Sequence, residues 1–282
     1  MRRNVAVSIG LIALLLLSGC SGLDLSGSTE TETTAGTSTH TTTGTDTMTP
    51  AQIEHPDGWN ETGVADIMAA YESHYRALFA HDSFTRNVSM QYLYPNQTVE
   101  STGAYDLSAS TYYRHERGTL NGSRSIARAW YQTDNQLYIA NLTGRPSYNS
   151  SDSNSFESSV AFFTNTPIGQ SGPIYYTISS VHFSGSERIV RDGETMFKFE
   201  ATAIDANDTT HFIPPMVNDS TVDSFSMTTI VDGEGLIRSA EYDITYTTSA
   251  GKTHSRSGFI KFTGLNETNV AKPDWLAEAK AN

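Results

Sequence analysis

The sequence predicts an α+β domain in which a large antiparallel β-sheet packs on one long N-terminal helix and a few short helices. Three observations support this prediction. Apolar residues recur at three- and four-residue spacing over one long stretch, 62–80. Further along, apolar and polar residues alternate in run after run. Short turns that contain glycine, such as Asp232-Gly233-Glu234-Gly235, join these runs into hairpins.

The N-terminal segment has the layout of an export signal. Arg2 and Arg3 precede an apolar run over 5–17, which ends in small residues. A bilayer core about 30 Å thick needs roughly 20 apolar residues in a helix, and this run is shorter. We therefore expect residues 1–19 to be a signal peptide that is removed. The two arginines also match a twin-arginine signal weakly, so the export route stays open.

Cys20 is the only cysteine in the chain and directly follows this segment. It cannot form an internal disulfide, and its place after Leu17-Ser18-Gly19 matches the lipobox of prokaryotic lipoproteins. We expect Cys20 to carry a lipid, which anchors the protein to the extracellular face of the cell membrane. Because one acyl chain anchors a protein only marginally, this modification should carry two chains.

Residues 20–55 form the expected lipid-anchored stalk. The stretch 24–50 is almost entirely Thr, Ser, Gly and Glu, and it has no periodic apolar face. Such a segment cannot bury enough surface to fold, and Ser/Thr-rich tracts often serve as glycosylated spacers. The folded part should then be a single extracellular domain over residues 56–282, because we find neither a second linker nor a repeat.

The composition is acidic, with 31 Asp and Glu residues against 18 Lys and Arg, of which only five are lysine. A negative surface repels phosphate backbones, so nucleic acid is not an expected partner. Acidic, lysine-poor surfaces are typical of proteins from high-salt environments, where a Debye length of roughly 3 Å at 1 M salt screens the self-repulsion. A mildly acidic protein from moderate salt is the alternative.

One amphipathic helix is predicted over residues 62–80, after a capping region at 59–62. Its apolar stripe comprises Val64, Ile67, Met68, Tyr71, Tyr75, Leu78 and Phe79. A stripe of this width must be covered by another element, and we expect the sheet to cover it.

Ten strands are predicted from the alternation. The first half contributes strands near 84–93, 98–107, 110–117, 125–132 and 136–142, and the second half contributes a meander near 186–190, 195–204, 224–231, 236–247 and 253–263. In the strand 195–204, for example, Phe197, Phe199, Ala201 and Ala203 alternate with polar residues. A sheet with this alternation is buried on one face only.

The stretch between the two halves is less regular. Residues 149–155 are polar and loop-like, 156–163 favour a short helix, and 175–183 fit either a helix or a strand. A last short helix is predicted at 273–279, where Pro273 occupies an allowed first position.

Nine Asn-x-Ser/Thr sequons occur in the chain, against about four expected by chance. They begin at Asn60, Asn87, Asn96, Asn121, Asn141, Asn149, Asn207, Asn218 and Asn266. We expect several of them to carry N-linked glycans. Asn- and Thr-rich loops alone also raise the count, so the occupancy stays open.

The sequence contains none of the common catalytic or phosphate-binding motifs. Neither a Gly-x-Ser-x-Gly elbow, a His-Glu-x-x-His helix, a phosphate loop nor a Gly-x-Gly-x-x-Gly turn occurs. His115-Glu116 lacks the second histidine of a zinc helix. His74 and His81 fit packing at the edge of the core better than metal binding. We therefore expect no enzyme activity, no metal and no cofactor.

Aromatic residues are abundant, with 14 tyrosines and 12 phenylalanines, many of them on the predicted inner face of the sheet. A close-packed core accounts for such a set. The sharper hypothesis is an apolar cleft between sheet and helix that admits a lipid or another hydrophobic ligand. Its lining would include Tyr71, Tyr75, Phe197, Phe199, Phe225, Tyr242 and Tyr246.

The order of these parts, from the lipobox through the stalk and one helix to the meander, resembles that of a family of haloarchaeal lipoproteins. The resemblance covers most of the chain, and Ile230–Gly235 and Lys272–Leu276 are its most recognisable segments. More remotely, the layout is similar to the LolA and LppX-like lipoprotein carriers. That resemblance implies a curved half-barrel sheet that wraps helices around a cavity for acyl chains, but fold alone does not determine function.

These observations predict a membrane-anchored extracellular lipoprotein that is not an enzyme and that binds a lipid or another hydrophobic ligand. The alternative is a ligand-free, glycosylated cell-surface module that acts in envelope structure or through protein partners that the sequence does not identify. A substrate-binding lipoprotein of a transporter is disfavoured, because such proteins need two α/β lobes and no alternating strand-helix pattern occurs here.

Overall fold

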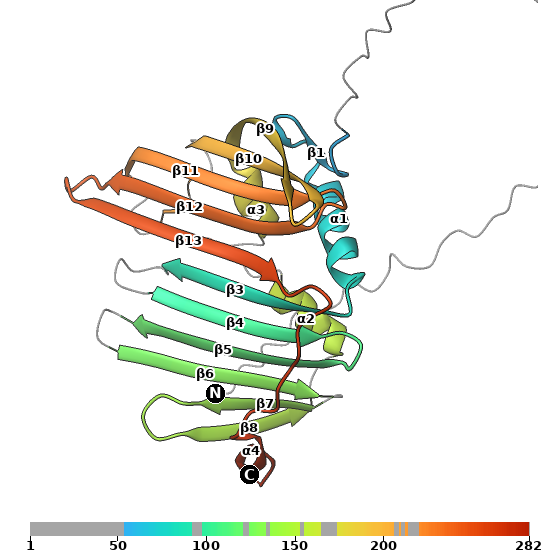
Figure 1. Ribbon diagram of the computed structural model, residues 1–282. Coiled ribbons are helices and arrows are strands. Elements are labelled where there is room, and N and C mark those ends of the chain that lie inside the picture. The colour runs from blue at the N-terminus through green and yellow to red at the C-terminus, as the bar shows by residue number, and fades with distance from the viewer. Residues whose placement is uncertain are drawn as a thin grey trace, which may run out of the picture. The chain divides into compact units, whose positions relative to one another are not determined.

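An 11-stranded antiparallel β-sheet forms the body of the domain (Figure 1). The computed structural model describes residues 54–91, 98–120, 124–133, 136–152, 155–164, 174–205, 209, 212–213 and 220–281. From one edge to the other the strands are β8 (Ser147–Asp152), β7 (Gln136–Asn141), β6 (Arg124–Thr133), β5 (Thr111–Leu120), β4 (Thr98–Asp106), β3 (Ser83–Gln91), β13 (Thr253–Thr263), β12 (Ile237–Thr247), β11 (Thr221–Asp232), β10 (Glu194–Ile204) and β9 (Val181–Arg191). The sheet is open, and the predicted α+β class with a large antiparallel sheet is confirmed.

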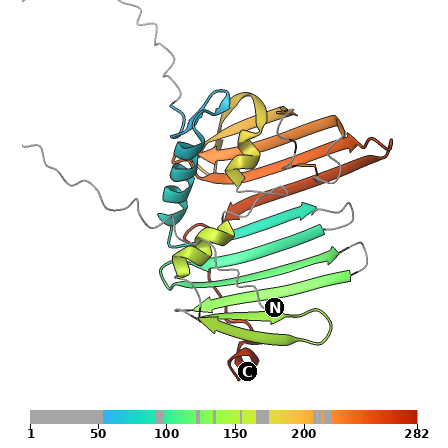
Figure 2. The ribbon, with the colours of Figure 1, turned by 180° about the vertical axis from the view of Figure 1, so that it is seen from behind.

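The sheet consists of two meanders that meet at its centre (Figure 2). The chain runs from β3 outward to β8, crosses to the opposite edge, and returns from β9 to β13. β13 then pairs with β3, from Gly258 opposite Met90 to Thr263 opposite Thr85. This long-range pairing makes one continuous sheet out of two halves that are each built from local hairpins.

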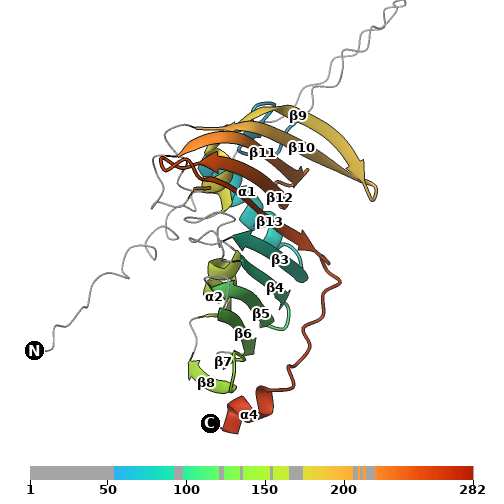
Figure 3. The same cartoon turned by 90° about the vertical axis from the view of Figure 1, so that its left-hand side faces the viewer.

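Helices cover parts of both faces of the sheet, which is curved (Figure 3). α1 (Ile67–Phe79), α2 (Phe156–Thr164) and α3 (Ile174–Ser179) lie on one side, which we call the inner face. There the ring of Phe156 lies 6.3 Å from that of Tyr112. α4 (Leu276–Ala281) lies on the outer face, against β7 and β8, and the preceding Trp275 stacks on Tyr148 at 6.2 Å.

The first helix is shorter than predicted. It begins at Ile67, and Asp66 caps it by accepting hydrogen bonds from the backbone N–H groups of Met68 and Ala69, at 2.9 and 3.1 Å. The expected capping region and first turn instead form a small hairpin of β1 (Trp59–Asn60) and β2 (Gly63–Val64). The prediction of one long helix over 62–80 is therefore wrong at its N-terminal end.

The buried face of α1 also differs from the predicted apolar stripe. The buried residues are Ala70, Ser73, His74, Ala77 and Leu78, whereas Met68 of the predicted stripe is 56% exposed. Small side chains on this face let the helix lie close to the β11–β12 turn. A Cβ atom on Gly235 of that turn would lie 2.5 Å from the Oγ of Ser73. Close approach, rather than hydrophobicity, therefore decides which face of the helix is buried.

The predicted strands are all present, and the structure adds β8 to the large sheet, besides the small β1–β2 hairpin. Residues 149–155 were expected to form a loop, but Ser147–Asp152 pairs with β7 along its whole length. The segment is polar on both faces, so it has no apolar alternation to reveal it. The ambiguous stretch 175–183 contains the end of α3 and the start of β9, and the last helix begins three residues later than predicted.

Alternation fails at one predicted inward position. Ala203 in β10 is exposed, while Phe197, Phe199 and Ala201 are buried. The pairing of β10 with β9 shifts register at Ala201 and again before Ala203, and such a bulge turns the following side chains.

None of the described helices is long and apolar enough to cross a membrane.

Candidate functional site

The sheet residues of the expected cleft lie in the packed core. Phe197, Phe199, Phe225, Tyr242 and Tyr246 are all buried in one hydrophobic cluster. The ring of Phe199 lies 4.7 Å from that of Trp59 and 5.7 Å from that of Phe183. Phe212 lies 4.9 Å from Phe225 and 5.2 Å from Tyr242. Phe199 therefore packs against the β1–β2 hairpin, whereas Phe225 and Tyr242 pack around Phe212.

The two helix residues of the expected cleft lie elsewhere. Tyr71 and Tyr75 are half-buried with their rings 4.9 Å apart, and Tyr75 stacks on Phe79 at 5.3 Å. Tyr75 and Phe79 line a groove of about 340 Å³ between α1 and α2. Within the described part of the chain, the seven predicted residues therefore occupy the core and the helix surface rather than one shared cleft.

A charged cluster that the sequence reasoning missed lies on the inner face of β3, β4 and β5. Arg86 in β3 and Arg114 in β5 flank Gly103 of β4, because Arg86 pairs with Gly103 and Gly103 pairs with Arg114. Cross-strand partners point to the same face, so both arginines project from the inner face. Gly103 between them has no side chain to separate them. They are 1% and 9% exposed.

The Tyr105 ring fills the space above Gly103. A Cβ atom built on Gly103 would lie 2.6 Å from the hydroxyl oxygen of Tyr105, so the hydroxyl lies over this glycine between the two arginines. Tyr105 is completely buried, and its hydroxyl has no hydrogen-bond partner among the described residues. A buried polar atom in this state is costly and calls for an explanation.

Neighbouring side chains hold Arg114 in place. Its Nε donates to the Ser101 hydroxyl at 2.8 Å, and its Nη2 forms an ion pair with Glu116 at 2.7 Å. Its guanidinium carbon lies 4.5 Å from the centroid of the Trp130 ring, a cation–π contact. The Arg114 side chain is 11% exposed and that of Glu116 is 17% exposed, so the cluster reaches solvent on this side.

Electrostatics couple the members of this cluster. Burial lowers the pKa of Arg86 to about 10, nearby Tyr105 raises it and the like charge of Arg114 lowers it. Burial raises the pKa of Tyr105, whereas Arg86 and Arg114 both lower it. Arg86 therefore keeps its charge near neutral pH, and Tyr105 stays a neutral donor. Two cations and a hydroxyl donor are the groups that bind carboxylate or phosphate.

The inner face becomes more accessible from β5 toward β7. By strand register, Trp130 of β6 and Ile139 of β7 continue the row of Arg114. Both are half-buried, as are Ile126 and Leu137 on the same face, while Arg128 is exposed. A partly exposed apolar surface therefore adjoins the charged cluster.

A third buried arginine has a structural role. Arg256 of β13 is 3% exposed and donates to the backbone carbonyls of Phe212, at 2.8 Å, and of Gln91. It ties two distant segments to the sheet.

One signal in the sequence could have revealed the buried Arg86. It lies between Phe84 and Val88 in an alternating strand, so the two-residue period already places its side chain on the inner face.

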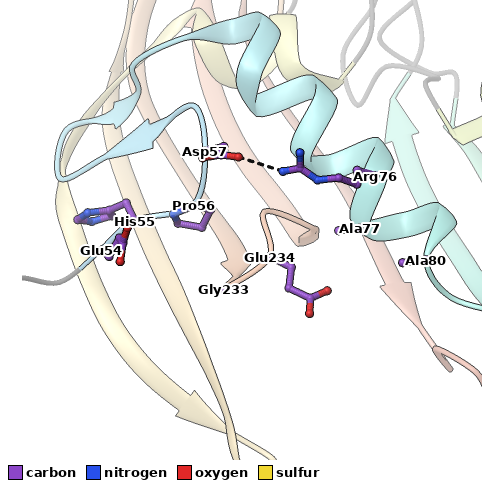
Figure 4. Close-up of a pocket in the computed structure, with 9 residues that line it drawn as sticks. All are labelled: Glu54, His55, Pro56, Asp57, Arg76, Ala77, Ala80, Gly233 and Glu234. Atoms are coloured by element: carbon purple, nitrogen blue, oxygen red, sulfur yellow. Dashed lines mark hydrogen bonds and ion pairs between the residues drawn. The ribbon is translucent and has the colours of Figure 1, made fainter. Parts of the chain in front are cut away.

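A separate surface cleft of about 520 Å³ lies where the domain begins (Figure 4). It is lined by Glu54, His55, Pro56 and Asp57, by Arg76, Ala77 and Ala80 of α1, and by Gly233 and Glu234 of the β11–β12 turn. Asp57 and Arg76 form an ion pair at 3.0 Å with both side chains exposed. No group of three or more candidate metal ligands occurs here or elsewhere in the described residues.

The structure describes five of the nine sequons. Asn141 and Asn149 are exposed, Asn60 and Asn87 are half-buried, and Asn266 is exposed. The side-chain oxygen of Asn87 accepts a hydrogen bond from Thr102 on the outer face, at 3.0 Å. The other sequons, at Asn96, Asn121, Asn207 and Asn218, lie outside the described residues, as does Cys20.

Comparison with known proteins places the chain in a family. A family model described as a family of unknown function, DUF7537, matches residues 5–279. No protein of curated function matches the sequence. Because the match spans nearly the whole chain, from the apolar N-terminal run to the last helix, the protein belongs to the family of unknown function DUF7537.

Proposed function

We propose that the protein is a membrane-anchored extracellular lipoprotein that holds a lipid, or another hydrophobic ligand with an acidic group, on the inner face of its sheet. The observation that carries this proposal is the position of Arg114. Its guanidinium group lies between the buried Arg86 and Tyr105 on one side and the half-buried Trp130 and Ile139 on the other.

The charged cluster and the apolar surface beside it together fit an amphipathic ligand. Half-buried apolar side chains on β6 and β7 offer a surface for a hydrocarbon chain, since each buried CH₂ group contributes about 0.8 kcal/mol. The cationic cluster offers charge-assisted hydrogen bonds to a carboxylate or phosphate. Glu116 already pairs with Arg114, so an acidic ligand would compete with that carboxylate for the guanidinium group.

The same proposal includes a half-barrel arrangement of the sheet and helices. An open, curved sheet with helices on its inner face is the arrangement that a half-barrel carrier of acyl chains needs. On this view α1, α2 and α3 cover one part of the inner face, and the ligand occupies the part toward β6 and β7. The packed aromatic residues Phe197, Phe199 and Tyr242 then support the sheet and do not line the ligand site.

The experiment is native mass spectrometry of the full-length protein after gentle extraction from its own membranes. We expect a bound lipid in addition to the covalent anchor, and we expect Arg114→Gln to lose it. Arg145→Gln is the matched control, because Arg145 is exposed in the β7–β8 turn and should leave the bound lipid in place. Tyr105→Phe, which preserves the fold of the strand, should weaken binding in the same direction.

Two other results are distinguishable from the expected one. If Arg114→Gln and Arg145→Gln both retain the ligand, the apolar surface binds without help from the cluster. If the wild-type protein carries no ligand, the proposal fails. A ligand-free glycosylated surface module is then the better account, and the close packing of Phe199, Phe225 and Tyr242 in the core agrees with it.

The anchor is tested independently of the ligand. We expect Cys20→Ser to be exported, to remain unprocessed and to lack the mass of the lipid, because the thiol is the only group that a lipobox modifies. If the Cys20→Ser protein were processed and retained like the wild type, the lipid anchor would be ruled out.

A further inference from the structure

Two of the five described sequons share one face of one hairpin. Ile139 pairs with Asn149 and Asn141 pairs with Ser147, so Asn141 and Asn149 are diagonal neighbours on the inner side of β7 and β8. Diagonal neighbours in an antiparallel pair lie about 7–8 Å apart. Both asparagines are exposed, because α4 packs on the opposite, outer face of these strands.

The amide nitrogen of Asn141 is oriented by its own sequon. The Oδ1 of Asn141 accepts a hydrogen bond from the backbone N–H of Thr143 at 3.2 Å. This leaves the Nδ2 as the outward atom of the carboxamide. Thr143 in turn accepts a hydrogen bond from the backbone N–H of Ala127 at 2.8 Å, which fixes the sequon at the end of the hairpin.

The other described sequons are constrained differently. The Oδ1 of Asn266 accepts a hydrogen bond from the backbone N–H of Asp82 at 2.8 Å, and its Nδ2 lies 3.1 Å from the Nδ1 of His81. Asn87 is half-buried in the middle of the sheet. Asn60 ends β1, and its Oδ1 accepts a hydrogen bond from the backbone N–H of Thr62 at 2.8 Å, as that of Asn141 does from Thr143. Burial separates the two, because Asn60 is half-buried and Asn141 is exposed.

We infer that the β7–β8 hairpin is the glycan-bearing edge of the domain, with Asn141 and Asn149 as acceptors of N-linked saccharide and with Asn60, Asn87 and Asn266 unmodified. In the transfer, the Nδ2 of asparagine forms a bond to the anomeric carbon of a saccharide carried on a lipid phosphate. The bond from that carbon to the phosphate oxygen breaks, the phosphate leaves with the electron pair, and the amide loses one proton. No oxidation or reduction is involved.

The position of these glycans has a physical consequence. β8 is an edge strand, and an exposed edge presents unpaired backbone groups that invite pairing with another chain. β8 is polar but carries only one charged residue, Asp152. A saccharide on Asn149 supplies the bulk that Ser147 and Ser151 on the same face of this strand lack. The inference does not depend on ligand binding.

The test is glycopeptide mass spectrometry on the full-length protein purified from the organism that makes it. We expect saccharide on the peptides that contain Asn141 and Asn149, and none on those that contain Asn60, Asn87 or Asn266. Ser151→Ala should remove one glycan from the intact mass, because it abolishes the sequon of Asn149 without changing the asparagine. Ser151→Thr is the matched control and should retain it.

The inference is overturned if Asn141 or Asn149 is unmodified, or if Asn60, Asn87 or Asn266 carries a glycan. Ser151 is exposed, so neither substitution is expected to prevent folding. If Ser151→Ala nevertheless failed to accumulate, Asn149→Gln gives the same readout, with Asn266→Gln as the control that should not change the intact mass.

Discussion

The Nδ1 atom of His74 accepts a hydrogen bond from the backbone N–H of Ile237, at 3.1 Å, and this contact joins the buried face of α1 to the first residue of β12. His74 is only 2% exposed, and its ring lies 5.4 Å from that of Phe262. Since Nδ1 must be unprotonated to accept this bond, the neutral imidazole carries its proton on Nε2. The native structure therefore requires an uncharged histidine at this position.

This requirement predicts a loss of stability in acid. Burial lowers the pKa of His74 from 6.5 to about 4. The unfolded chain binds a proton at His74 between pH 6.5 and pH 4 while the folded chain does not, so the stabilisation is complete above pH 6.5 and is lost as the pH falls toward 4. The expected loss is about 3 kcal/mol. Urea denaturation at pH 7 and pH 4.5 measures it.

The variant His74→Asn isolates this effect from the titration of carboxylates. The Oδ1 of asparagine can accept the Ile237 hydrogen bond but does not titrate. We expect His74→Asn to be less stable than the wild type at pH 7, because it leaves a cavity, and to lose less stability between pH 7 and pH 4.5. Equal slopes for the two proteins would rule out His74 as the acid-sensitive group.

A second prediction concerns the close approach of the β11–β12 turn to α1. Gly235 has a φ of +92°, and an added Cβ would lie 2.5 Å from the Oγ of Ser73. Gly193 also has a positive φ, +83°, but an added Cβ there meets nothing within 4 Å. We expect Gly193→Ala to cost about 1–2 kcal/mol from backbone strain alone.

Gly235→Ala should cost about 1–3 kcal/mol more than Gly193→Ala, because overpacking adds to the same strain. Thermal denaturation of both variants measures the difference. Equal melting temperatures would mean that α1 moves freely away from the turn, which the contact of Gly235 with Ser73 argues against.

A third prediction tests whether the Tyr105 hydroxyl lacks a hydrogen-bond partner in the ligand-free protein or is hydrogen-bonded within the fold. A buried hydroxyl without a hydrogen-bond partner costs about 1–3 kcal/mol. If the ligand-free fold leaves the hydroxyl in that state, Tyr105→Phe should unfold at the same or a higher urea concentration than the wild type. Phenylalanine keeps the ring that packs 4.7 Å from Phe84. A clear loss of stability would show that the hydroxyl is hydrogen-bonded within the fold itself.

A fourth prediction concerns α4 and the outer face. Leu276 is 7% exposed and does not belong to the main core, and α4 packs against β7 and β8. Leu276→Ala should cost about 2 kcal/mol, the lower end for a buried leucine, because the residue lies at the edge of the domain. Hydrogen exchange should speed up in β7 and β8 and stay unchanged in β11 and β12.

Leu142→Ala is the control for this variant. Leu142 lies in the β7–β8 turn and is 37% exposed, so its truncation removes little buried surface and should leave exchange in β8 nearly unchanged. Faster exchange throughout the sheet after Leu276→Ala would mean that α4 supports the whole domain and not one edge of it.

Periodicity explains how much of the fold was predictable. The alternation of apolar and polar residues located the strands from β3 to β7 and from β9 to β13, since it depends on neighbours two positions apart. It missed β8, whose side chains are polar on both faces. It also misjudged α1, because the small residues Ser73 and Ala77 on its buried face lie beside the β11–β12 turn, where Gly235 is 162 residues beyond Ser73 in the chain.

The candidate site was less predictable for a related reason. Alternation places Arg86 and Arg114 on the inward face of their strands, but it cannot say that one glycine separates them. Their proximity follows from the register of β3, β4 and β5. In the same way, the nine sequons look alike in the sequence, and only burial and hydrogen bonding distinguish Asn149 from Asn87 and Asn266.

The sequence by itself determined the class of the domain, the antiparallel hairpins and the absence of the common catalytic motifs, because these depend on composition and on local spacing. It also predicts the lipid on Cys20. The tertiary structure alone decided that β13 pairs with β3, that Arg86 and Arg114 meet across Gly103, and that His74 must stay neutral. Each of these depends on contacts between distant segments, which form only when the chain collapses around one core and local spacing does not specify them.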